Sequence, residues 1–544
     1  MSNQGDSVGA FVGENLRFLI VEDSSFFRSA VSGMLNAFGV TKIEAVQNGQ
    51  QAMEACRSRH YDVVLCDYDL GKGQTGQQLL EALRHNDIIN RTTLFMMVTA
   101  DTSRQAVLAS SECSADDYLT KPINAVVLKR RVSRLLNLNK QFSPVFKALD
   151  QNDTHQAIQY LELLAEPPLR NAGYANKLLG EVLLQTNQID SAERLYQKVI
   201  ADKPLEWARL GLAFVAQARG QLDDANAIFT AISRDNPFCL AAFDGLAKNY
   251  HLQDDFINLQ KSIAAAVRAS PASILRQKNL ANIAEQNGDI PTALEALREC
   301  VRLGYHSCYG DWQDAYRLGM NTADMPPALQ EEKDKLPEEA LMILKAATNY
   351  FDVSNEDLLR MQFLQGRLQF LSNQGALGEQ SIYKAEALYC ELEQGSVVTD
   401  IARVKAIRTL KENTRAEELT EDLKDLYADD QKALQKLDEI LDEPASKKNR
   451  RILAETNKKG IQLYSEKKFD EAINCFQRAQ VLFPRHLGIQ LNICQAYIGK
   501  HNRGDAGDID QIVQEMLVNI RSQLSPSDPQ FPRYRKLQEM ARLQ

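Results

Sequence analysis

The sequence predicts two kinds of folded region in one chain: an N-terminal α/β domain with a doubly wound parallel sheet, followed by a long all-α helical solenoid. Two observations predict this division. Short, continuously apolar runs alternate with helix-period stretches as far as about residue 138, and such runs are missing beyond it. In the later part, prolines recur at Pro204, Pro237 and Pro271, which are 33 and 34 residues apart, as repeats of a helical pair would place them.

Length, composition and charge limit the classes of protein to consider. A chain of 544 residues is long enough for several domains, and 44% hydrophobic with 25% charged residues is typical of globular proteins. The net charge of −9 is unfavourable for sequence-independent binding to nucleic acid. No basic leader and no apolar run approaching 18 residues is visible, so we expect no membrane insertion. Nine scattered cysteines without a CxxC pair predict reduced thiols, and together these features predict a cytoplasmic location.

The N-terminal domain is predicted from the alternation of strands and helices. The expected strands are 16–21, 43–46, 62–67, 94–99 and 117–122, and the expected helices are 25–38, 49–58, 76–85, 103–112 and 123–137. Strands that are apolar throughout and alternate with helices indicate a parallel sheet covered on both faces. Five strands and five helices in this length predict a doubly wound domain of flavodoxin-like size.

Polar residues stand where the predicted strands end. Glu22 and Asp23 follow the first strand, Asp67 ends the third, Thr99 ends the fourth and Lys121 follows the fifth. The carboxyl ends of parallel strands meet at one crevice, so these groups should converge there. Three carboxylates at neutral pH need a counter-charge, which a hard divalent cation such as Mg²⁺ or Mn²⁺ supplies. The remaining ammonium group suits an anion, and a phosphoryl group satisfies both the metal and the lysine.

The region from about residue 16 to 138 resembles the CheY-like receiver domain of two-component response regulators. The resemblance rests on an ordered set of residues at the strand ends: Glu22-Asp23, Asp67, Thr99-Ala100, Tyr118 and Lys121-Pro122. An ordinary flavodoxin-like domain would have to place all these groups at one crevice by chance. The pair Glu22-Asp23 departs from the commoner Asp-Asp, and the loop after Asp67 lacks a proline often found there.

The resemblance implies a role for each of these residues. Asp67 would accept a phosphoryl group from the phosphohistidine of a sensor histidine kinase or phosphotransfer protein. Lys121 and Thr99 would bind the phosphoryl oxygens. Thr99 and Tyr118 would form the switch that responds to phosphorylation. Mg²⁺ or Mn²⁺ would be held by four groups: the side chains of Glu22, Asp23 and Asp67, and the backbone carbonyl of Asp69.

Two further expectations come from the family pattern. The Lys121–Pro122 peptide bond is expected to be cis. The additional acids Asp69 and Asp101 are expected to change the lifetime of the aspartyl phosphate.

The helical part resembles the tetratricopeptide repeat (TPR), a 34-residue pair of antiparallel helices. A small residue and a large one recur four positions apart, as in Ala192…Tyr196, Ala225…Phe229 and Ala472…Phe476. The small residue lets two helices approach closely and the large one packs into the next repeat. After a flexible tail (1–15) and the receiver (16–138), we expect TPR-like repeats over 139–305, degenerate helical repeats over 306–450 and C-terminal TPR repeats over 451–544.

One segment of the degenerate region has a heptad pattern. Apolar positions spaced 3-4-3-4 predict a long charged helix over about 416–441. That helix would either form a coiled coil in a homodimer or pack on the neighbouring repeat. The polar stretch from Pro444 to Arg451 predicts a break after it. Its basic cluster, 447–451, is interpreted as a solvated turn and not as a nucleic-acid site.

No motif of an output enzyme is present: the sequence lacks GxxxxGK[ST], HExxH, GxSxG and a GGDEF-like loop. We therefore expect a response regulator phosphorylated on Asp67 whose output is protein–protein interaction through the TPR solenoid. Its only chemistry would be the receiver's own phosphotransfer and autodephosphorylation. The alternative is a phosphate sink or a constitutive TPR scaffold without a phosphorylation-dependent output.

Overall fold

The computed structural model describes residues 15–71, 73–100, 115–166, 169, 171–325, 335–392, 395–501, 509–524 and 528–542. The chain forms two compact units. The first comprises Met1–Arg276 and Leu303–Gly310, and the second comprises Gln277–Arg302 and Asp311–Gln544. The helix expected over 103–112 and the acid Asp101 lie outside the described residues.

The N-terminal domain contains a five-stranded parallel sheet with the strand order β2-β1-β3-β4-β5. Its strands are β1 (Arg17–Val21), β2 (Lys42–Val46), β3 (Val63–Asp67), β4 (Leu94–Thr99) and β5 (Asp117–Thr120). The described helices between and after them are α1 (Ser25–Ala37), α2 (Gly49–Ser58), α3 (Gly76–His85) and α5 (Ala125–Asp150). The predicted doubly wound α/β fold is confirmed.

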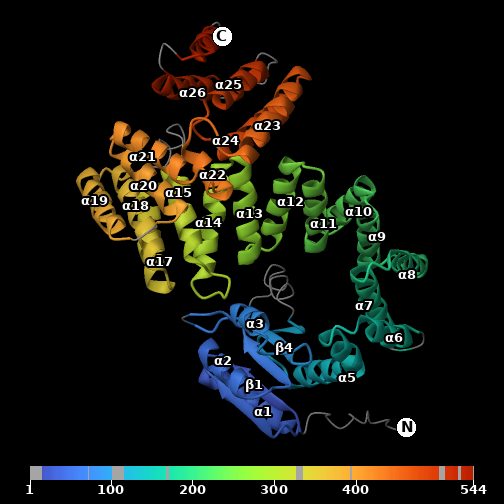
Figure 1. The fold of residues 1–544 in the computed structure, drawn as a ribbon. Helices are drawn as coiled ribbons and strands as arrows, with labels where there is room; N and C mark the ends of the chain where they lie inside the picture. The colour runs from blue at the N-terminus through green and yellow to red at the C-terminus, as the bar shows by residue number, and fades with distance from the viewer. Residues whose placement is uncertain are drawn as a thin grey trace, which may run out of the picture. The chain divides into compact units, whose positions relative to one another are not determined.

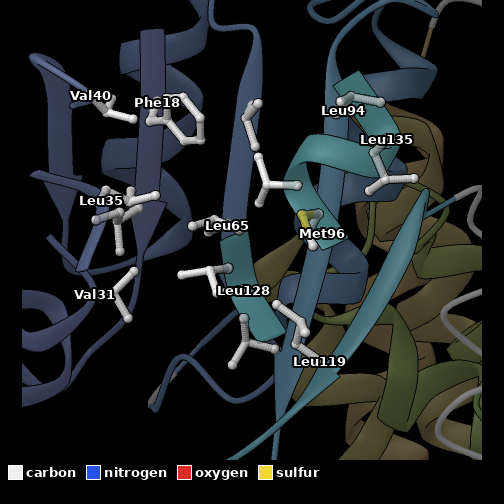
Figure 2. Close-up of a cluster of buried hydrophobic side chains, with 14 of the residues drawn as sticks. Phe18, Val31, Leu35, Val40, Leu65, Leu94, Met96, Leu119, Leu128 and Leu135 are labelled. Carbon is white, nitrogen blue, oxygen red and sulfur yellow. The ribbon is translucent and has the colours of Figure 1, made fainter. Parts of the chain in front are cut away.

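Both faces of the sheet are buried, which explains why β3 and β4 are apolar without alternation. One face packs against α1 and α5 through side chains such as Leu35, Leu65 and Leu128, as Figure 2 shows. The opposite face packs against α2 and α3, where Phe95 and Leu79 are fully buried. Every residue of β3 and β4 is buried as a result.

Helix α5 extends 13 residues beyond the helix expected over 123–137. Its first half, including Leu128 and Leu135, belongs to the core of the sheet domain. Its second half, including Phe142 and Val145, belongs to the core of the first helical pairs. Figure 1 shows this helix leading from the sheet directly to α6. The expected domain boundary after residue 138 therefore falls inside one continuous helix.

Paired helices follow along the rest of the chain, which confirms the predicted all-α region. Their bounds are α6 (Thr154–Ala165), α7 (Ala172–Gln185), α8 (Ile189–Asp202), α9 (Glu206–Ala218), α10 (Leu222–Asp235), α11 (Leu240–Leu252), α12 (Phe256–Ala269), α13 (Ile274–Asn287), α14 (Ile290–Gly304), α15 (Trp312–Ala323), α17 (Leu336–Tyr350), α18 (Asn355–Leu371), α19 (Gly375–Cys390), α20 (Val397–Thr409), α21 (Asn413–Leu426), α22 (Gln431–Leu437), the 3₁₀ turn η1 (Asp438–Ile440), α23 (Lys447–Ser465), α24 (Phe469–Leu482), α25 (Leu487–His501), α26 (Ile509–Gln523) and α27 (Phe531–Arg542). None of the described helices is both long enough and apolar enough to cross a bilayer.

Small residues allow the close helix approach that the repeat pattern predicts. A Cβ on Gly211 would lie 2.3 Å from the ring of Tyr196, and one on Gly245 would lie 2.4 Å from the ring of Phe229. In the C-terminal repeats, a Cβ on Gly460 would lie 2.4 Å from the ring of Phe476. In all three places a buried ring occupies the space that a side chain would need.

The prediction of one long helix over 416–441 is wrong. The segment is divided into α21, α22 and η1, because the Asp430 side chain accepts the N–H groups of Lys432 and Ala433 and starts a new helix. Most of the heptad positions pack inside their own unit, where Ala416 and Leu437 are fully buried against α20, although Leu426 is exposed. This agrees with the alternative of packing on a neighbouring repeat and leaves no free seam for a coiled coil.

The predicted solvated turn at 447–451 is also wrong. Ser446 caps a helix by accepting the N–H of Asn449, and the basic residues form the start of α23. The buried carboxylate of Asp438 fixes this start, because it accepts hydrogen bonds from the hydroxyl of Ser446 and the amide of Asn449.

Candidate functional site

Four charged side chains meet at the carboxyl ends of the central strands. Glu22 and Asp23 follow β1, and Asp67 is the last residue of β3. Each of the three offers a carboxylate oxygen within 4.8 Å of the others. The ammonium of Lys121, just beyond β5, lies 2.8 Å from Glu22 Oε2 and 2.7 Å from Asp67 Oδ2. The tertiary structure thus brings together the acids and the lysine that the strand ends predicted.

Burial makes it costly to keep the carboxylates of this pocket ionised. Glu22 and Asp67 are 2% and 6% exposed, whereas Asp23 is open to solvent. Burial raises the pKa of both Glu22 and Asp67, and the hydrogen bonds from Lys121 oppose the rise. Partial burial acts to lower the pKa of Lys121, but its hydrogen bonds to Asp67 and Glu22 dominate and raise it. The lysine is therefore held as a cation between two acids that lack full solvation.

The first turn of α1 shapes the acidic side of the pocket. Ser24 caps this helix, and Arg28, one turn further on, donates to the backbone carbonyls of Glu22 and Asp23 at 2.5 and 2.8 Å. The ring of Phe27 lies 4.3 Å from the ammonium of Lys121. Sequence reasoning missed Phe27 and Arg28. The available signal was their position one turn after the acidic pair. Their contacts with the pocket become evident only when the position of α1 is known.

Glycines shape the loop that follows Asp67. The N–H of Gly76 donates to the carbonyl of Tyr68, and a Cβ on Gly76 would lie 2.1 Å from the carbonyl oxygen of Asp67. Gly76 begins α3, whose N-cap Thr75 forms a capping box with Gln78. The start of α3 is thus pressed against the backbone of Asp67. Sequence reasoning did not identify Gly76 as part of the site.

The Asp69 side chain is not among the three carboxylates that approach one another. The side chain is exposed, and its carboxylate accepts the N–H of Gly71, whose φ of +77° closes the turn. Backbone N–H groups of Asp69 and Tyr68 also bind the Asp67 carboxylate and act to lower its pKa.

Thr99 and Tyr118 lie on neighbouring strands. Thr99 ends β4 and is 4% exposed, and its carbonyl accepts the N–H of Lys121 at 2.7 Å. Tyr118 lies in β5 opposite Met97 and is half-buried against the core cluster under α2 and α3. The Lys121–Pro122 bond is cis, as expected.

The three acids suit a hard divalent cation. Mg²⁺ and Mn²⁺ prefer oxygen ligands, and Mg²⁺ is typically bound by one or two carboxylates together with water and phosphate oxygens. Glu22, Asp23 and Asp67 provide such oxygens. Glu22 and Asp67 are buried, and Asp23 is open to solvent. The pKa values of Glu22 and Asp67 are raised because these acids are buried and Lys121 does not fully offset the burial. A bound cation would supply the missing positive charge.

Comparison with known families agrees with this geometry. The family described as "Response regulator receiver domain" matches residues 18–133. The N-terminal domain is a response-regulator receiver. The family described as "Tetratricopeptide repeat" matches residues 207–229, which contain most of α9 and the first part of α10. The chain therefore joins a receiver to a long helical region that includes a TPR.

Two chemotaxis proteins are similar to this chain over nearly their whole length. The chemotaxis protein CheY of Pseudomonas aeruginosa is 28% identical over 120 residues, which is 22% of this chain and 95% of that protein. Chemotaxis protein CheY-3 of Vibrio cholerae is 25% identical over 126 residues, which is 23% of this chain and 95% of that protein.

Solved structures of receiver domains are also similar to this chain. One is the receiver domain of a signal transduction histidine kinase from Syntrophus aciditrophicus, at 32% identity and a TM-score of 0.21, covering 22% of this chain and 90% of the other. Another is CheY4 of Vibrio cholerae, at 26% identity and a TM-score of 0.21, covering 22% and 98%.

Proposed function

We propose that the receiver accepts a phosphoryl group on Asp67 and that this modification is the input of a two-component phosphorelay. The position of Lys121 carries the proposal. Its ammonium contacts Asp67 and Glu22 at once, so the acceptor oxygen lies beside a fixed cation at the open end of the sheet. A transferred phosphoryl group would find the same cation next to it.

The proposed donor is a phosphohistidine of a sensor histidine kinase or phosphotransfer protein. A carboxylate oxygen of Asp67 forms a bond to phosphorus as the bond from phosphorus to the histidine nitrogen breaks, and the bonding electrons return to the imidazole. Hydrolysis reverses the modification when water attacks phosphorus and releases inorganic phosphate and the Asp67 carboxylate. No other enzymatic activity is proposed.

Each neighbouring group has a proposed task. Lys121 pairs with phosphoryl oxygens, and the Thr99 hydroxyl donates to one of them. Glu22, Asp23, Asp67 and the carbonyl of Asp69 would hold Mg²⁺ or Mn²⁺, which when bound offsets the negative charge of acceptor and phosphoryl group. Thr99 and Tyr118 are proposed as the switch, because they lie on the two strands that border the pocket on its β4–β5 side.

The proposed output is binding of another protein by the helical repeats, in the cytoplasm where histidine kinases deliver their phosphoryl groups. The chain contains many successive helix pairs, and helical repeats bind peptides and helices on the surfaces that such pairs form. The partner is a protein, and neither nucleic acid nor a bilayer is part of this proposal.

Phosphorylation is tested on the full chain with acetyl phosphate and Mg²⁺, followed by intact mass. The wild type should gain one phosphoryl group, and Asp67→Asn should gain none. Asp69→Asn is the matched control. It removes a neighbouring carboxylate but leaves the backbone carbonyl and an oxygen that can accept from Gly71, so it should still be phosphorylated. Label on Asp67→Asn, or none on the wild type, would refute the assignment.

The output is tested separately from the chemistry. Hydrogen exchange and partner capture are compared between the phosphorylated and unphosphorylated full chain, with Asp67→Asn treated identically. Changes that require Asp67 would support a phosphorylation-dependent output. A chain that is phosphorylated but otherwise unchanged would instead be a phosphate sink, or a scaffold whose binding ignores the receiver.

A further inference from the structure

Two helices of the second unit carry opposite charge. α23 contains six basic residues and a single acid, Glu455. α21 contains five acidic residues and two basic ones. In a chain with a net charge of −9, the basic helix is a local exception that composition does not account for.

The basic residues of α23 gather on one side of the helix. Asn449, Leu453 and Gly460 are buried on the inner side. Lys447, Arg451 and Lys458, spaced by four and seven residues, fall on the opposite side and are exposed. Lys448 and Lys459 flank them and are exposed as well. We call these five residues the basic face: Lys447, Lys448, Arg451, Lys458 and Lys459.

The acids of α21 gather in the same way. Ala416 and Thr420 are buried on the inner side. The outer side carries four exposed acids at spacings of three, four and seven residues. We call these four residues the acidic face: Glu418, Glu421, Asp422 and Asp425.

The chain's own ion pairs leave most of these charges unmatched. Across the described part of the chain, the ion pairs on the two faces are Arg451–Glu455 at 2.7 Å and Glu421–Lys424 at 3.0 Å, each within one helix. Four lysines of the basic face and three acids of the acidic face form no ion pair with described residues. Like charges held this close repel each other, and an oppositely charged surface would relieve the repulsion.

Each face also borders an exposed aliphatic side chain. Leu426 next to the acidic face is 66% exposed, and Ile461 next to the basic face is 57% exposed. Charge that is complementary between two surfaces steers their association and fixes how they align. The apolar residue beside each face adds area that the contact can bury. Nucleic acid or an anionic membrane would use the basic face but would leave the acidic face and Leu426 without a role.

We propose that the basic face of one copy of this chain binds the acidic face of a second copy. The contact joins two different surfaces, so a pair of copies related by a two-fold axis would make it twice, and other arrangements would extend it to further copies. Ala416 and Thr420 of α21 take no part, because they are buried in their own unit. The proposal is independent of phosphorylation of Asp67.

Surface ion pairs are individually weak and are screened by salt. Self-association should therefore be concentration-dependent at 50 mM NaCl and lost at 500 mM NaCl. Sedimentation velocity of the full chain over a concentration series measures this. A wild type that stays monomeric at low salt up to about 100 µM, a concentration that corresponds to very weak binding, would overturn the proposal.

Charge reversal locates the contact. The triple variant Lys447→Glu, Arg451→Glu, Lys458→Glu and the triple variant Glu418→Lys, Asp422→Lys, Asp425→Lys should each raise the dissociation constant by about tenfold or more. An equimolar mixture of the two should associate again, because each then offers the face that the other lacks. The matched control reverses three exposed lysines of the first unit, Lys198, Lys203 and Lys261, and should associate like the wild type.

Two results would overturn the assignment even if the wild type associates: equal association of all variants, or no rescue in the mixture. The substituted side chains are exposed, and circular dichroism confirms that each variant is folded before it is measured. The wild type is also tested against phosphatidylserine vesicles and a 20-base-pair DNA duplex. Binding to either without self-association would reassign the basic face and end the proposal.

Discussion

At the level of single residues, the receiver pocket depends on how closely its neighbours pack around Asp67. Asp67 is held on one side by Lys121 at 2.7 Å. On the other side the start of α3 lies against the Asp67 carbonyl, at a point where only glycine fits. The acids and the lysine supply the charges, and Gly76 permits the close packing that positions one of them.

Gly76→Ala should destabilise the protein. Its methyl group would lie 2.1 Å from the Asp67 carbonyl oxygen, so the loop or the start of α3 must move, at a cost of about 1–3 kcal/mol in the free energy of unfolding. Gly33→Ala in α1 is the control, since nothing lies within 4 Å of its Cβ. There the gain in helix propensity should stabilise the protein by about 0.5–1 kcal/mol. Denaturant unfolding measures both, and equal effects would contradict the packing argument.

Asp116 should make the stability of the receiver depend on pH. Burial raises its pKa from 3.8 to about 6, although its carboxylate accepts the N–H of Phe95 at 2.7 Å. The folded state therefore favours the neutral carboxyl. The stabilisation of the folded receiver by neutral Asp116 is complete below about pH 4 and is lost as the pH rises through about 6. It amounts to on the order of 1–2 kcal/mol, because the side chain keeps some solvent contact.

Asp116→Asn tests this directly, because an amide oxygen can still accept from Phe95. The thermal unfolding temperature of the wild type should fall between pH 5 and pH 7.5 by more than that of the variant. Identical pH profiles for the two proteins would show that another group controls the dependence.

At the level of elements, the repeats are held by rings packed against glycine. Tyr196 in α8 lies between Gly180 of α7 and Gly211 of α9, so one side chain joins three successive helices. Phe229 packs against Gly245, and Phe476 packs against Gly460, each with one glycine. The 34-residue period therefore corresponds to a physical unit, in which a ring fills the space that glycine leaves open.

Gly211→Ala should weaken the α7–α9 region. The added methyl group would lie 2.3 Å from the Tyr196 ring, and displacing this buried ring should cost about 1–3 kcal/mol. Gly173→Ala in α7 is the control, because its Cβ would point into open space. Hydrogen exchange followed by mass spectrometry should show faster exchange in α7, α8 and α9 for Gly211→Ala alone. Unchanged exchange would mean that the ring is free to move.

At the level of the whole molecule, α5 belongs to two cores. Its first half covers the receiver sheet and its second half fills the core of the first helical pairs, where Phe142 contacts Tyr174 at 4.9 Å between ring centroids. Arg91, in the loop after α3, also pairs with Asp150 at the end of this helix at 3.0 Å. The receiver is thus joined to the first repeat by one continuous element and not by a flexible linker.

Two substitutions in α5 should separate these roles. Phe142→Ala should loosen α6 and α7 at a cost of about 3–5 kcal/mol and leave phosphorylation of Asp67 at the wild-type rate. Leu135→Ala should cost about 2–5 kcal/mol in the receiver core and slow phosphorylation. Regional hydrogen exchange and acetyl phosphate labelling measure the two effects. Loss of phosphorylation in Phe142→Ala would show that the halves of α5 are more tightly coupled than their packing indicates.

The order of the described strands and helices of the receiver, the acids and the lysine of the pocket, and the recurring small and large residues of the repeats could be predicted from the amino-acid sequence. These features follow from short-range regularities: apolar periodicity, turns and polar residues at strand ends. Glu22, Asp67 and Lys121 were predictable because parallel topology brings the ends of separate strands to one edge.

Other features depended on tertiary contacts or on side-chain caps. The extension of α5 to Asp150 was decided by packing against α6 and α7. The break at Asp430 and the helical start at Ser446 come from side-chain caps a few residues away, which apolar periodicity does not reveal. A heptad pattern records only that one side of a segment is apolar, and here the unit's own core covers most of that side and leaves Leu426 exposed. Periodicity reveals which residues are buried, whereas the surface that buries them is decided only when the whole chain packs.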